Sequence, residues 1–265
     1  MIKVIRLDEI EYIIKLCILS RFIKGERGVS AMILAPPEHG KSEILKKFAK
    51  ISSVRITSDF NTFVFEEIAT ESMLGKIKTI MIPDFLRVVK KKYSTQATSL
   101  TILNAITEEG WVGKLPTGRV VDKPVHLNVI TALTMDELKD KRHRWAKMGF
   151  LSRFLPISYT YKNETVNLIR GYIKSRMYHT EDFHTFKIPE SDIEIAHGSN
   201  IADMVEKITL DISEKENIMG FRLERQLQVL CMANAIASGR TITTEEDVEI
   251  IKRLSKYINY RFSPI

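Results

Sequence analysis

The segment with the clearest chemistry is APPEHGKS, residues 35–42, which follows an apolar run and precedes a helical pattern. A loop that binds nucleotide phosphates needs inward-turned backbone N–H groups, a Lys that reaches the β- and γ-phosphates, and a hydroxyl that holds Mg²⁺. Gly40, Lys41 and Ser42 supply the last three positions of the pattern GxxxxGK[ST]. The ATP-binding residues expected from this P-loop are Pro37, Glu38, His39, Gly40, Lys41 and Ser42, with Ser42 also on Mg²⁺.

The loop departs from the full pattern at its entry. Ala35 stands where the first Gly is usual, and Pro36 and Pro37 stiffen the turn while removing two N–H donors. The alternative interpretation is an ordinary strand, turn and helix in which the GKS is incidental.

A mainly parallel α/β sheet is the arrangement that would position such a loop. Short β-branched runs alternate with helical patterns through the first two thirds of the chain, which is typical of α/β units. The run at residues 29–35 is almost continuously apolar, as expected of a strand buried on both faces. Further strands are expected at residues 54–57, 78–82, 127–133 and 155–159. Helices are expected from Asp8, as N-cap, to about Phe22, and around Leu100, Leu103 and Ile106 up to Gly110.

Helices replace strands after about Glu164, and helical periodicity lapses at residues 187–200. One lid helix is expected to start near Phe221, and the next opens where Thr243 and Glu246 have the spacing of a capping box. We therefore expect an α/β core at residues 1–186 and a small all-helical lid at residues 187–265.

Composition limits the classes of protein to which the chain can belong. With 44% hydrophobic and 28% charged residues it can bury a core, and it is neither a disordered tail nor a membrane protein. Its two cysteines, Cys17 and Cys231, stand in apolar helical patterns, which excludes a disulfide framework or a Cys-rich zinc site and fits a cytoplasmic setting. No run approaches the roughly 20 apolar residues that cross a bilayer. Forty Lys and Arg against 33 Asp and Glu give a net charge of +7, which permits a nucleic-acid partner without requiring one.

Five segments, in their order along the chain, resemble those of AAA+ ATPases of the MoxR and minichromosome-maintenance branch. KTIMIPDFLRV occupies the second nucleotide motif, LTILNAITEEGWVGKLPTGRV resembles the helix and hairpin that follow, and LNVITALT resembles the first sensor strand. GFLSRF resembles the family's arginine box, and GFRLERQLQVLCMANAIASGRTITTEEDV resembles the second-sensor helix and the helix after it. The resemblance runs from about Val29 to Tyr257.

The resemblance implies Mg²⁺-dependent ATP hydrolysis by a ring or open spiral of about six subunits. Thr134 falls where the family usually has the Asn of the first sensor, Arg153 would reach a neighbouring subunit's site, and Arg222 would be the second sensor. Positive charge around the γ-phosphate and an oriented water are what such a reaction needs. The alternatives are a surface Arg at position 153, and an Arg222 paired with Glu224 or Glu246.

The second nucleotide motif is incomplete. The family motif ends in Asp-Glu, for the metal and the attacking water, whereas this chain has Pro83-Asp84-Phe85. If Phe85 is aligned with the Phe of the family's IDEF, Asp84 occupies the position of the Glu. If the alignment is counted from the end of the strand, Asp84 occupies the position of the Asp and Phe85 replaces the Glu. Asp59 would supply a second acid, unless it forms an Asx-turn. Slow hydrolysis is therefore expected.

Two basic segments are candidates for binding DNA. Residues 139–147 carry five Lys or Arg against one acid, and the expected hairpin is also basic. One interpretation is that Lys114, Arg119, Arg142 and Arg144 make non-specific contacts with DNA phosphates. The alternative is a set of solvated helix faces, with a Trp that anchors its helix. The histidines show no metal-ligand spacing.

The function expected from these patterns is that of an oligomeric ATPase that remodels, loads or regulates, in association with DNA. One alternative is a MoxR-like chaperone that acts on protein without touching DNA. The other is a scaffold in which nucleotide occupancy switches assembly and little is hydrolysed.

Overall fold

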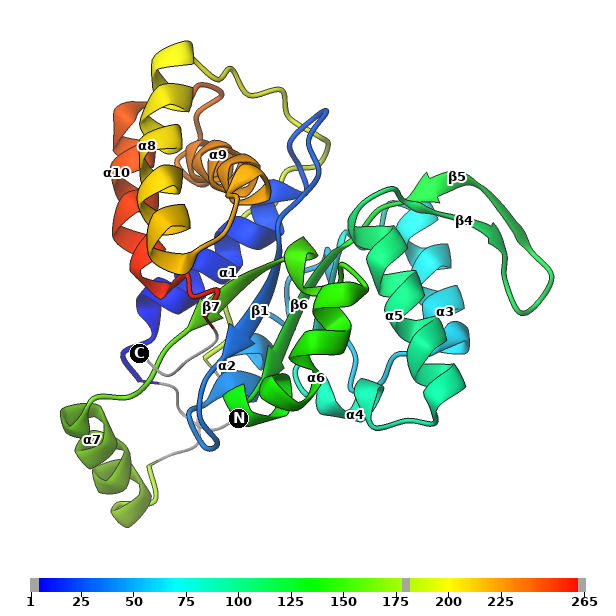
Figure 1. Cartoon of the computed structure of the whole chain (residues 1–265), viewed down its shortest axis with the longest axis horizontal. Coiled ribbons are helices and arrows are strands. Elements are labelled where there is room, and N and C mark those ends of the chain that lie inside the picture. Colours follow the sequence, from blue (N-terminus) through cyan, green and yellow to red (C-terminus); the bar gives the residue numbers. More distant parts are fainter. Residues whose placement is uncertain (1–4, 178–181, 262–265) are drawn as a thin grey trace.

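The β-branched runs form one parallel sheet in the computed structural model, which describes residues 5–177 and 182–261. The strand order is β2-β3-β6-β1-β7, and every neighbouring pair is parallel (Figure 1). All five expected strands are confirmed, within one or two residues at each end. Their bounds are β1 Ser30–Leu34, β2 Val54–Ile56, β3 Thr79–Ile82, β6 Asn128–Leu133 and β7 Phe154–Ser158.

Helices cover both faces of this sheet, and a hairpin projects from one end of the molecule (Figure 1). The helices before the C-terminal region are α1 Asp8–Ser20, α2 Lys41–Lys46, α3 Thr62–Met73, α4 Leu86–Val89, α5 Tyr93–Thr107, α6 Met135–Lys147 and α7 Asn163–Lys174. Of these, α7 projects away from the sheet (Figure 1). The antiparallel hairpin is β4 Trp111–Lys114 with β5 Val120–Val125, as the resemblance implied. The C-terminal region contains α8 Ser199–Glu216, α9 Phe221–Ala237 and α10 Glu245–Leu254; short 3-10 turns, η1 Leu151–Arg153 and η2 Ser255–Tyr257, complete the elements.

Strand β1 shows how the sheet divides the hydrophobic core. Successive strand residues point to opposite faces. Ala31 and Ile33 accordingly join one buried cluster, and Met32 and Leu34 join the other. The first cluster includes α1, α2 and the buried faces of α8, α9 and α10, so the C-terminal helices share their core with one side of the sheet. The second cluster contains α3, α5, α6 and an aromatic group built around Phe85, Trp145 and Phe150.

Three local details differ from the sequence-based expectations. Leu7, not Asp8, is the N-cap of α1, and Asp8 is its first helical residue. The capping box of α10 joins Thr244 to Asp247, one residue beyond the expected Thr243 and Glu246. Helices α3 and α8 were not predicted, although the Asn61 side chain caps α3 by accepting hydrogen bonds from the N–H groups of Phe63 and Val64. In the part of the chain that the structure describes, no helix is both long and apolar enough for a transmembrane span.

A buried polar network centred on Asp247 holds the C-terminal helices to α1. The fully buried Asp247 carboxylate accepts hydrogen bonds from Arg240 at 2.6 and 2.9 Å and from the Asn234 side chain at 2.6 Å. The Asn234 side-chain oxygen in turn accepts a hydrogen bond from the hydroxyl of Tyr12, which lies in α1. Burial alone would raise the pKa of Asp247, but Arg240 and Asn234 stabilise the carboxylate and lower that pKa overall. The stabilisation is therefore complete above the ordinary Asp pKa and is lost as pH falls through the lowered one.

We predict that Asp247→Ala lowers the free energy of unfolding by about 3–5 kcal/mol, because it leaves Arg240 and Asn234 without their buried acceptor. Urea denaturation followed by circular dichroism measures the change. Glu249→Ala in the same helix is the matched control, because Glu249 and Lys252 form an exposed pair at 3.9 Å and its loss should cost at most about 0.5 kcal/mol. Equal midpoints for the two variants would show that the network contributes no stability.

Candidate phosphate-binding site

The loop predicted to bind phosphate leaves the carboxyl end of β1, in the interior of the sheet. Strand β1 lies between β6 and β7, and the Ala35 N–H continues its pairing by donating to Leu133 O at 3.4 Å. The backbone turns through the left-handed region at Glu38 (φ 63°) and at Gly40 (φ 73°), directly before α2. Glycine adopts this conformation without steric cost, which explains the Gly ahead of Lys41. The carboxyl edge of a parallel sheet is where open α/β folds bind ligands.

Lys41 lies folded over this loop. Its Nζ donates hydrogen bonds to Ala35 O at 2.9 Å and to Pro36 O at 2.7 Å. Burial lowers the pKa of Lys41, and the charge of Glu137 opposes that shift. The ammonium is thus placed at the loop by backbone carbonyls, with which phosphate oxygens would compete for the same donor.

The end of β3 brings the second motif beside Ser42. The Ser42 hydroxyl donates to Pro83 O at 2.9 Å, so Pro83 is the residue next to the loop. Phe85 is completely buried and stacks on Phe150 with a ring-centroid distance of 5.6 Å, so its side chain belongs to the core. The Asp84 carboxylate is about half exposed and pairs with Arg87 Nε at 3.1 Å. This strand end therefore offers one carboxylate, from the residue after Pro83.

Thr134 follows β6, between the strand that carries the loop and the strand that carries Asp84. It caps α6: its hydroxyl accepts the Glu137 N–H at 3.2 Å, and the Glu137 carboxylate accepts the Thr134 N–H at 2.8 Å. This capping box is readable in the sequence as T-x-x-E, but the sequence reasoning missed Glu137.

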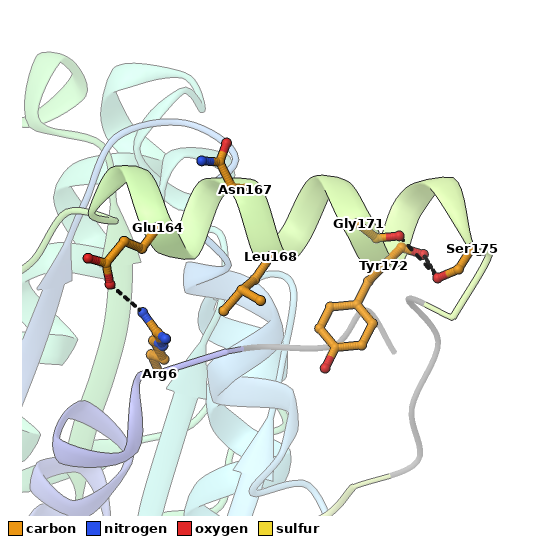
Figure 2. Close-up of a pocket in the computed structure, with 7 residues that line it drawn as sticks. All are labelled: Arg6, Glu164, Asn167, Leu168, Gly171, Tyr172 and Ser175. Carbon is orange, nitrogen blue, oxygen red and sulfur yellow. Dashed lines mark hydrogen bonds and ion pairs between the residues drawn. The ribbon is translucent and has the colours of Figure 1, made fainter.

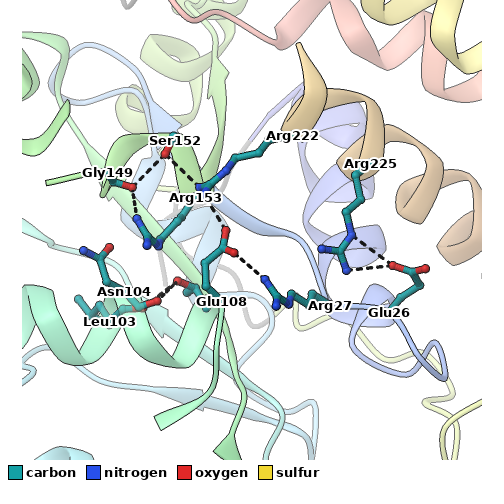
Figure 3. Close-up of polar contacts among 11 residues, drawn as sticks. Glu26, Arg27, Leu103, Asn104, Glu108, Gly149, Ser152, Arg153, Arg222 and Arg225 are labelled. Carbon is teal, nitrogen blue, oxygen red and sulfur yellow. Dashed lines mark hydrogen bonds and ion pairs between the residues drawn. The ribbon is translucent and has the colours of Figure 1, made fainter. Parts of the chain in front are cut away.

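Arg153 and Arg222 are close to one another, because Arg222, on α9, contacts Ser152, the residue before Arg153 (Figure 3). Arg153 immediately precedes β7, whose first residue pairs with Ser30 at the start of β1. β1 alone spans roughly 13 Å between its start and the loop. Arg153 donates to Gly149 O, and Arg222 donates to the Ser152 hydroxyl at 3.0 Å. Within one chain, neither arginine is brought to Lys41.

Glu108 organises this second group of charges. Its carboxylate binds Arg222 at 3.1 Å and Arg27 at 2.7 Å, from α9 and from the segment before β1 (Figure 3). Arg222 therefore has an ion-pair partner, but it is neither Glu224 nor Glu246. This ion pair could not be predicted from sequence spacing, because Glu108 and Arg222 are far apart in the sequence.

The basic residues proposed to contact DNA lie on two different elements. Lys114 and Arg119 belong to the projecting hairpin and its turn, whereas Arg142 and Arg144 lie on α6. Arg144 stacks over the Tyr93 ring at 4.4 Å, and Arg142 donates to Arg261 O at 3.4 Å, so these two point to different neighbours. Trp145 is fully buried against Phe85 and Phe150 and anchors α6, as the alternative interpretation held.

Asp59, the other acid considered for the site, and the histidine His184 have structural partners. Asp59 pairs with Lys91 and accepts the Phe60 N–H at 2.7 Å. Its pKa is lowered overall, because these partners outweigh the effect of burial, which alone would raise it. His184 binds Glu11 at 2.7 Å, beside the buried Lys47. His179 lies outside the described residues.

A hollow of about 560 Å³ lies along α7, and none of its lining residues belongs to the predicted site. Figure 2 shows Leu168 and Tyr172 pointing from α7 to the side where Arg6 pairs with Glu164 at 3.1 Å. Its lining carries no phosphate-binding loop, so we do not assign the nucleotide to it.

Comparison of the chain with protein-family models and with curated proteins gives no match.

Proposed function

We propose that the chain binds Mg-ATP and hydrolyses it slowly, as an AAA+ ATPase of the MoxR and minichromosome-maintenance type. The observation that carries the proposal is the loop after β1, with its left-handed turn at Gly40 and its Lys41 ammonium held over the loop carbonyls. Strand, loop, Lys and helix follow one another as a P-loop requires.

The residues at this edge fit a magnesium–nucleotide complex. Mg²⁺ takes one or two protein carboxylates and completes its shell with phosphates and water. Asp84 and the Ser42 hydroxyl meet that requirement, and among residues 5–177 and 182–261 there is no group of three His, Cys, Asp or Glu suited to a different metal. When bound, Mg²⁺ would neutralise charge on the transferring phosphoryl group. Lys41 would hold the β- and γ-phosphates, and Thr134 would supply a hydroxyl beside them.

The two arginines explain why this function would require assembly. Phosphoryl transfer is accelerated by an arginine that reaches the γ-phosphate, on the order of 10³–10⁵-fold in related enzymes. Neither Arg153 nor Arg222 is brought to the loop of its own chain, so we propose that they act on the loop of a neighbouring copy. Head-to-tail contacts of this kind generate rings when the rotation closes. We therefore propose a ring or spiral of about six subunits that remodels or loads a macromolecule.

Two other functions would use the same loop. A MoxR-like chaperone would use the same site on protein substrates, without the basic hairpin touching DNA. A scaffold would bind ATP and assemble with little turnover, which the single carboxylate at the end of β3 favours.

Lys41→Ala should abolish ATP binding, because the triphosphate loses the ammonium placed over the loop. Isothermal calorimetry with Mg-ATP measures the affinity. Lys46→Ala is the control: it removes the same charge from the same helix, but Lys46 is half exposed and pairs with Glu43. Unchanged affinity in Lys41→Ala would refute the phosphate-loop assignment.

A mixing experiment tests the arginine in trans. Lys41→Ala and Arg153→Ala should each lack turnover, since one loses the phosphate ligand and the other loses the arginine. In mixed assemblies some contacts join an intact Lys41 to an intact Arg153, so the mixture should hydrolyse ATP faster than the sum of the two alone. A phosphate-release assay measures the rates. Additive rates would show that Arg153 does not act across the interface.

The DNA hypothesis concerns the hairpin. Lys114→Glu with Arg119→Glu should weaken retention of double-stranded DNA at least tenfold at 50 mM salt, because phosphate contacts depend on released counterions. Arg170→Glu with Lys174→Glu, on α7, makes the same change in net charge away from the hairpin. Equal retention by both double variants, measured by fluorescence anisotropy, would favour the protein-remodelling alternative.

A further inference from the structure

The end of β3 provides no second carboxylate to orient the attacking water. Hydrolysis needs an acid that orients the attacking water in addition to an acid near the metal, and β3 supplies only Asp84, beside Pro83. Asp84 is turned to Arg87. Asp59 is held by Lys91 and by the N–H of Phe60. A second carboxylate must therefore come from another element at the same edge.

Hydrogen bonds trace a short path from Lys41 to the end of β6. Lys41 Nζ binds Ala35 O, and the Ala35 N–H binds Leu133 O. On the other side of β6, the Phe85 N–H, next to Asp84, binds Ala132 O at 3.2 Å. The residue after Leu133 is Thr134, the cap of α6. The Thr134–Glu137 capping box thus lies at the end of the strand that separates the loop from Asp84.

The capping box fixes the Glu137 side chain at this position. Its Oε2 accepts the Thr134 N–H at 2.8 Å, while Thr134 Oγ1 accepts the Glu137 N–H at 3.2 Å. One carboxylate oxygen is thus engaged by the helix cap, and a carboxylate has further acceptor positions on its other oxygen. The charge of Glu137 also acts on the Lys41 ammonium, where it opposes the lowering of that pKa by burial. The strand order agrees with this, because β6, which leads into α6, lies between β1 and β3.

We propose that Glu137 is the carboxylate that orients the attacking water and accepts its proton, in place of the acid absent from the end of β3. The inference rests on the proposed ATPase function. The water oxygen forms a bond to the γ-phosphorus while the bond from that phosphorus to the β–γ bridging oxygen breaks. ADP leaves with the bridging oxygen and its electron pair, the water proton passes to Glu137, and Glu137 returns it to solvent. Asp84 is then left for the metal side.

The test compares Glu137→Gln with Asp136→Asn. The Gln side chain keeps an acceptor for the Thr134 N–H, so the cap persists, but it cannot take a proton. Asp136, the preceding residue, is highly exposed and pairs with Lys139, so its change controls for charge in the first turn of α6. Turnover is measured by phosphate release from the assembled protein, and binding is measured by calorimetry with a slowly hydrolysed ATP analogue.

Glu137→Gln should lower turnover about 100-fold or more, the range for loss of a general base, with analogue affinity within about twofold of the parent. Asp136→Asn should stay within about twofold in both. Glu137→Asp retains the charge one methylene further back, and its turnover should fall between that of the parent and that of Glu137→Gln; it carries the test if the Gln variant does not fold.

Turnover in Glu137→Gln equal to the parent's would overturn this inference and leave the ATPase intact. Loss of analogue binding in parallel with turnover would also overturn it, because Glu137 would then be structural. A parent that binds the analogue but hydrolyses nothing would refute both the inference and the proposed hydrolysis, and one that fails to bind would refute the phosphate site itself.

Discussion

Strand β1 is buried on both faces and hydrogen-bonded on both edges, and most of the molecule is arranged by that constraint. A strand in this position must carry apolar side chains on both sides, and each side must be covered by helices. Residues Ala31 and Ile33 face α1, α2 and the C-terminal helices, and Met32 and Leu34 face α3, α5 and α6. Because β1 is paired with a strand on each edge, the loop that follows it starts from a defined position in the sheet. The parallel direction of its neighbours then brings the ends of β3 and β6 to the same edge.

Buried charges attach the outer helices to this frame. Lys47, after α2, binds Glu11 of α1 at 2.7 Å, and both side chains are less than a tenth exposed. Tyr12, one residue further on, reaches Asn234 and through it Asp247. Helix α1 therefore connects the C-terminal helices to α2, the helix that begins at the loop after β1. Removal of one partner from such a buried pair is costly, because it leaves the other charge buried without compensation.

The sequence predicted what depends on local pattern and missed what depends on distant partners. The apolar run at β1, the GKS at the start of α2 and the periodicity of α9 are all local, and the structure has each element where it was expected. Arg222 was located on its helix correctly, but its partner, Glu108, lies more than a hundred residues away, and no spacing rule relates them. The capping box of α10 was off by one residue because Thr243 and Thr244 are both followed by an acid three positions later.

The candidate site shows the same division. Lys41 and Ser42 could be found from a motif. Glu137 could be found as the acid of a T-x-x-E capping box, but its place at the end of the strand between β1 and β3 follows only from the strand order. Phe85 illustrates the reverse case. The motif alone does not decide which family positions Phe85 and Asp84 occupy. The complete burial of Phe85 against Phe150 shows that its side chain belongs to the core.

The separation of Lys41 from the two arginines has a consequence for counting. If copies join head to tail as proposed, an open row of n chains contains n − 1 complete sites, and it ends in a loop without arginines and in arginines without a loop. Only a closed ring pairs every loop with the arginines of a neighbouring chain. The first and last chains of an open spiral therefore differ chemically from the rest, although their sequences are identical. Such an assembly would have a direction, and its two ends would present different surfaces to whatever passes through or along it.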